Sequence, residues 1–70
     1  MNPRAAELSS LATGLDELTR RVTTIADAYA SADADEVALD LYAVERALVD
    51  AHRRLMRTVQ SQTRPERGPA

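Results

Sequence analysis

Apolar residues follow a seven-residue repeat through the first half of the chain. They are spaced alternately three and four residues apart, at Leu8, Leu11, Leu15, Leu18, Val22, Ile25, Tyr29 and Ala32. This spacing is the a/d pattern of a helix that packs along its length on another helix. It predicts a helix over about residues 3–30, for which Asn2 and Pro3 are favoured starting residues.

The second half of the chain carries the same repeat, at Val37, Leu41, Val44, Leu48, Ala51, Leu55 and Thr58. It predicts a second helix over about residues 34–63. Between the two patterns, Asp33 and Glu36 have the spacing of a capping box, so we expect a short turn at about residues 31–33. The alternative is one continuous long helix, because this stretch contains neither glycine nor proline.

When the chain is folded back at this turn, the two apolar repeats match layer by layer. The fold class expected for residues 1–63 is therefore all-α, an antiparallel two-helix hairpin of the coiled-coil type. Gly14 lies beside the repeat, and close packing is its expected role, with a hinge as the alternative. Residues 64–70 contain proline, glycine and charge, and we expect a disordered tail.

A second apolar stripe runs along the predicted second helix and recurs every seven residues at Tyr42, Val49 and Met56. Because one seam buries little area in so small a chain, we expect two hairpins to associate into a four-helix bundle, with docking of a different helical protein as the alternative. The residues expected at this interface are Leu39, Tyr42, Glu45, Val49, His52, Met56 and Val59. Within it, His52 is expected to meet Glu45 of a second chain, unless both side chains reach solvent at the rim.

All nine basic residues of the chain are arginines, and several are expected to gather at the open end of the hairpin: Arg4, Arg53, Arg54 and Arg57. One interpretation is complementarity to the dipole of the second helix, whose carboxyl end carries the negative pole. The other is binding of an anion such as phosphate, nucleic acid or an acidic protein. Because no base-stacking aromatic residue lies nearby, we expect no sequence-specific reading of nucleic acid.

Other residue types narrow the possible functions. The chain has no cysteine, a single histidine and two glycines, so we expect no metal site, no cofactor, no phosphate-binding loop, no small-molecule substrate and no enzyme. No apolar run reaches the roughly 20 residues of a membrane span, and no secretory segment is recognised, so a cytoplasmic location is expected.

The expected function is that of a non-catalytic scaffold, adaptor or regulatory protein–protein interaction module. The alternative is an arginine-dependent binder of nucleic acid or of a nucleotide, through the open end of the hairpin. Salt would separate the two, because binding to phosphates weakens steeply with salt concentration and an apolar interface does not.

Overall fold

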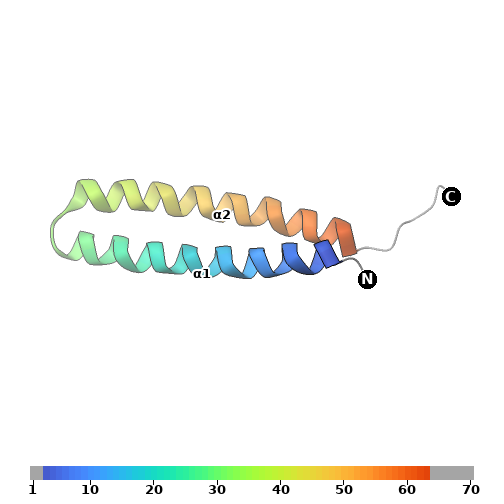
Figure 1. Ribbon diagram of the computed structural model, residues 1–70. Helices are drawn as coiled ribbons and strands as arrows, with labels where there is room; N and C mark the ends of the chain where they lie inside the picture. Colours follow the sequence, from blue (N-terminus) through green and yellow to red (C-terminus); the bar gives the residue numbers. More distant parts are fainter. Residues whose placement is uncertain (1–2, 64–70) are drawn as a thin grey trace.

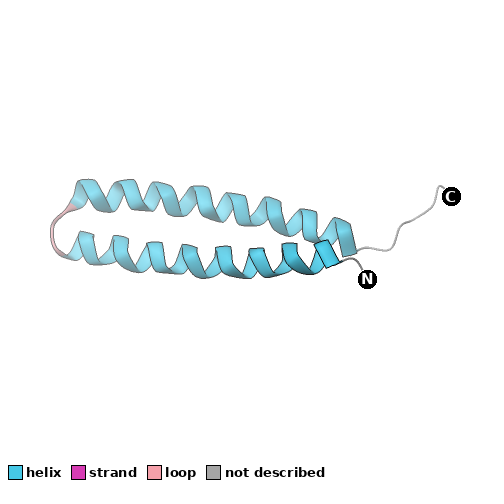
Figure 2. Cartoon of the chain, viewed as in Figure 1, coloured by secondary structure: helices cyan, strands magenta, loops and turns pink. Residues whose placement is uncertain are grey.

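Two long helices lie side by side in the computed structural model, which describes residues 3–63. Helix α1 comprises Pro3–Ser31, and helix α2 comprises Asp35–Thr63. A single short loop joins them, and they run antiparallel in one layer (Figures 1 and 2). The prediction of an all-helical chain with two helices packed on each other is confirmed. The expected role of Asn2 and the expected tail at 64–70 lie outside the described residues.

The turn is a helix-ending motif centred on Asp33, which has a left-handed φ of 61°. The backbone N–H of Asp33 donates to the Ala30 carbonyl at 3.2 Å, and that of Ala34 donates to the Tyr29 carbonyl at 2.9 Å. These two bonds are those of a Schellman motif, in which a glycine usually occupies the left-handed position. Aspartate tolerates this conformation better than most residues, and this explains why the turn contains no glycine.

The predicted capping box is wrong. Asp33 belongs to the end of α1 because its φ is left-handed, whereas a residue that caps a helix start has extended backbone geometry. The first helical hydrogen bond of α2 is accepted by Ala34, whose carbonyl receives the N–H of Ala38 at 3.0 Å. Asp35 and Glu36 lie in the first turn of α2, where their negative charge is favourable.

The helices meet along a stripe that we call the packed seam, made of buried and half-buried residues. On α1 its members are Ala5, Leu8, Ala12, Leu15, Thr19, Val22 and Ala26. On α2 they are Ala38, Leu41, Glu45, Leu48, His52, Leu55 and Val59, and Ala34, just before α2, extends the stripe. Among the described residues, four of the five buried apolar ones are alanines, and none of the large side chains is fully buried. The contact between the helices therefore depends on close approach of their backbones.

This seam corrects the predicted one. The a positions Leu8, Leu15 and Val22 of α1 and Leu41, Leu48 and Leu55 of α2 lie between the helices as expected, whereas the a position Tyr29 is 42% exposed. The d positions are not between the helices, and the e positions take their place. Leu11, Leu18 and Ile25 of α1 are exposed, and so are Val37 and Val44 of α2. The physical reason is the size of the e residues on α1, which are Ala5, Ala12, Thr19 and Ala26. Small side chains allow the helices to approach closely, and each helix is rotated to place them at the contact.

The single polar residue in the buried part of the seam satisfies its own hydrogen bond. The Thr19 hydroxyl donates to the Leu15 carbonyl one turn earlier at 2.8 Å, which removes the cost of burying it.

Close packing does not explain Gly14. A Cβ atom built on it would meet nothing within 4 Å, so the expected packing role is wrong within the hairpin.

Candidate functional site

The seven residues predicted at an interface lie on α2 in three different environments. Leu39 and Val49 are exposed, at 67% and 37% of their surface. Four others are half-buried against α1: Tyr42, Glu45, His52 and Met56. Val59 is buried in the packed seam at 7% exposure. The pairing of His52 with Glu45 of a second chain stays a prediction, and within the hairpin both residues lie along the packed seam.

Tyr42 connects the two helices near the turn. Its hydroxyl donates a hydrogen bond to the carboxylate of Asp27 on α1. This bond holds the proton on the phenol and raises the pKa of Tyr42 above its usual value, and burial and the charges of Asp27 and Glu45 act in the same direction. The Tyr42 hydroxyl therefore joins the two helices of its own hairpin.

Alkaline pH is expected to weaken this contact, because loss of the phenol proton removes the hydrogen bond and places a phenolate beside carboxylates. A raised pKa means that the stabilisation is fully present below about pH 10, the usual pKa of tyrosine, and is lost as the pH rises through the folded value. Absorbance of the phenolate measures the titration in a Tyr29→Phe background, in which only Tyr42 contributes. Adding Asp27→Asn should lower the midpoint; an unchanged midpoint would contradict the assignment of the bond.

The arginines predicted to bind an anion are all exposed at the open end of the hairpin: Arg4, Arg53, Arg54 and Arg57. Arg4 lies 3.8 Å from the carboxylate of Glu7, and Arg54 lies 3.6 Å from that of Asp50. Both ion pairs are solvated and contribute little to stability. Arg4 and Arg54 thus each have a carboxylate of the same helix as an ion-pair partner. Anion binding at this end of the hairpin stays a prediction.

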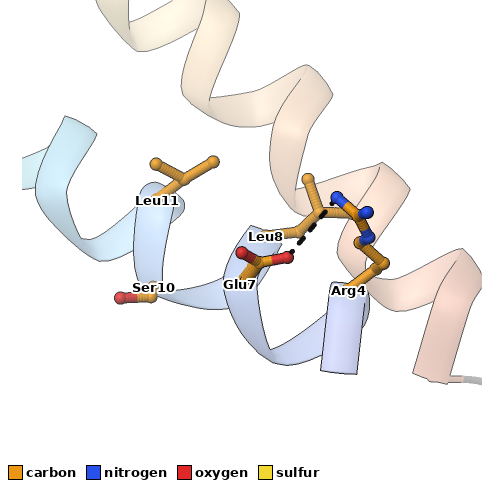
Figure 3. Close-up of a pocket in the computed structure, with 5 residues that line it drawn as sticks. All are labelled: Arg4, Glu7, Leu8, Ser10 and Leu11. Atoms are coloured by element: carbon orange, nitrogen blue, oxygen red, sulfur yellow. Dashed lines mark ion pairs between the residues drawn. The ribbon is translucent and has the colours of Figure 1, made fainter. Parts of the chain in front are cut away.

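An open depression lies on α1 at this same end, lined by Arg4, Glu7, Leu8, Ser10 and Leu11. Figure 3 shows the ion pair of Arg4 with Glu7 beside the side chain of Leu8, with Leu11 farther along the helix. A second depression has walls from both helices, at Ser9, Ala12, Thr13, Asp16, His52 and Met56. No group of three or more possible metal-ligating side chains occurs among residues 3–63.

One exposed apolar surface is made of residues that the sequence pattern assigned to the interior. We call it the leucine face, and it consists of Leu11, Leu18, Ile25, Val37 and Val44. Their exposed fractions run from 41% for Val37 to 62% for Leu11. The signal that could have revealed this face is the run of small residues at the e positions of α1, which marks where close packing is easiest.

The leucine face lies on the side of the hairpin opposite Tyr42. On the Tyr42 side of the hairpin, the second depression and the bond between Tyr42 and Asp27 mark where one flank of α1 lies next to one flank of α2. In an antiparallel pair, the other flanks of the same two helices lie next to each other on the opposite side. The d positions of both helices therefore share one surface, to which α1 and α2 both contribute apolar side chains.

In a comparison with known proteins, no protein-family description, curated protein or solved structure matches this chain.

Proposed function

We propose that the protein is a non-catalytic interaction module that binds other helices through its leucine face and completes a four-helix bundle. The observation that carries this proposal is the exposure of five large aliphatic side chains on one side of a two-helix layer. Contiguous apolar patches on a soluble protein mark interaction sites. Apolar side chains that repeat every seven residues along two neighbouring helices can pack between the ridges of another helix pair.

The composition of the packed seam supports the same conclusion. Alanine buries little apolar area, and four of the five buried apolar residues are alanines. Scaffolds of this size usually gain stability from disulfides, metals or association, and the sequence contains no cysteine. Covering the leucine face with two more helices would add the large buried side chains that the hairpin itself lacks.

Site-specific photo-cross-linking tests this proposal in the cells that express the protein. A benzoylphenylalanine in place of Leu18 is expected to give a covalent adduct with a second polypeptide. The matched control carries the same group in place of Glu17, which is exposed next to Leu18 on the outer side of α1. Equal yields at the two positions would overturn the proposal. The mass of the adduct tells whether the partner is a second copy of the chain or another protein.

A further inference from the structure

Charge is distributed unevenly along the hairpin. Between Asp27 and Glu45, around the turn, the chain has six acidic residues and no basic one. At the open end, residues 3–16 and 50–63 contain four arginines and the three acids Glu7, Asp16 and Asp50. The hairpin is therefore acidic at its turn and basic at the opposite end, and the leucine face runs between these two ends.

This polarity decides how two leucine faces can meet. Two copies laid face to face with their turns at the same end would place acid against acid and arginine against arginine. Two copies laid in opposite directions place each acidic turn over the basic end of the other. Like charges across an interface cost free energy and complementary ones favour association. The antiparallel arrangement also has the two-fold symmetry that most dimers adopt.

We infer that the partner of the leucine face is a second copy of this chain, laid antiparallel with the two-fold axis passing close to Leu18. This inference rests on the proposed function and adds the identity of the occupant. In this arrangement α1 lies on α1 of the second copy, and α2 lies on α2.

The positions of the apolar side chains agree with this axis on both helices. With Leu18 facing its own copy, Leu11 faces Ile25 of the partner subunit. On α2 the same axis passes between Ala47 and Leu48, so that Val44 faces Ala51 of the partner subunit. One register therefore pairs the d positions of both helices at once.

The charged residues that border the leucine face agree with the same register. Asp40 and Arg54 lie on α2 about seven residues to either side of this axis, and both are exposed. The antiparallel copy places Asp40 opposite Arg54 of the partner subunit, and the symmetry makes this contact twice. In the single hairpin the nearest carboxylate to Arg54 is that of Asp50, at 3.6 Å.

Single cysteines test the register directly, because the chain contains no cysteine of its own. Under mild oxidation, Leu18→Cys is expected to form a covalent dimer, since a residue on the axis meets its own copy. Leu11→Cys alone should not form one, but a mixture of Leu11→Cys with Ile25→Cys should. Glu17→Cys is the control for random collision. Absence of the Leu18→Cys dimer, or equally rapid dimerisation of Leu11→Cys, overturns the inference.

Charge reversal tests the polarity independently. Asp40→Arg and Arg54→Asp should each weaken the dimer about tenfold in sedimentation equilibrium, because each replaces two attractions by two repulsions. Mixing the two variants should restore the affinity, since the mixed dimer regains both contacts. The matched control is Arg53→Asp, which changes a neighbouring charge on the side away from the leucine face. Equal weakening by Arg53→Asp, or failure of the mixture to recover, overturns the inference.

The proposed function can survive the failure of this inference. If the chain stays monomeric in these experiments but forms an adduct with a different protein through position 18 in cells, the proposed function stands and the inference of a second copy is refuted. If the chain stays monomeric and forms no adduct in cells, both are refuted.

Discussion

Replacing Ala26 by leucine is expected to lower the free energy of unfolding by about 1–3 kcal/mol, and to separate the helices near the turn. Ala26 is 0% exposed, so three additional carbon atoms at this position must displace its neighbours in the packed seam. Urea denaturation followed by circular dichroism measures the change. The control is Ala28→Leu, which adds the same volume at an exposed position of the same helix.

The same experiment separates two descriptions of the hairpin. If the a and d positions formed the interior, as the repeat alone predicts, Ala26 would lie at the rim and a leucine there would be tolerated. Equal stability of the Ala26 and Ala28 variants would therefore refute the packed seam described above.

Replacing Leu48 or Leu18 by alanine is expected to lower the free energy of unfolding, and the two losses should depend differently on protein concentration. Leu48 is half-buried in the packed seam, so Leu48→Ala should lower the free energy of unfolding by about 2 kcal/mol at every concentration. Leu18 is 47% exposed in the hairpin. The loss from Leu18→Ala should be about 1 kcal/mol in dilute protein and should increase as association covers this residue.

Thermal melts over a hundredfold range of concentration measure this difference. The Leu48→Ala variant serves as the internal reference, because its contact lies within one chain. A constant loss for Leu18→Ala over the whole range would mean that no second chain covers Leu18, and would count against the proposed interface.

Much of the fold could be predicted because it depends on features that are local in the sequence. The seven-residue spacing indicates two helices and their packing on each other. The rotation of each helix was missed because periodicity gives equal weight to Leu18 and Ala12, whereas packing does not. A small residue permits a shorter distance between the helix axes, and here that advantage outweighs the burial of larger side chains.

The turn shows a different limit of sequence reasoning. Aspartate is favoured both at the start of a helix and, less often, in the left-handed position after a helix. The spacing of Asp33 and Glu36 agrees with the first role, and only the backbone conformation reveals the second.

The candidate surfaces could be predicted only in part. The sequence pattern predicts Tyr42 at an interface with a second chain, and its bond to Asp27 joins positions that no periodic pattern brings together. The leucine face was assigned to the interior, because its residues are those that a core would contain. From the sequence alone, an apolar residue that contacts a partner cannot be distinguished from one that packs in the core.

The scarcity of large buried side chains has a consequence for the response of the protein to temperature. The heat-capacity increase on unfolding comes from newly hydrated apolar surface, at about 0.45 cal/mol/K per Å². A contact made mostly of alanines exposes little such surface, so a single hairpin should fall below the roughly 12–15 cal/mol/K per residue of globular proteins. Its stability curve is then broad and shallow, and its folded population changes little over the range in which cells grow.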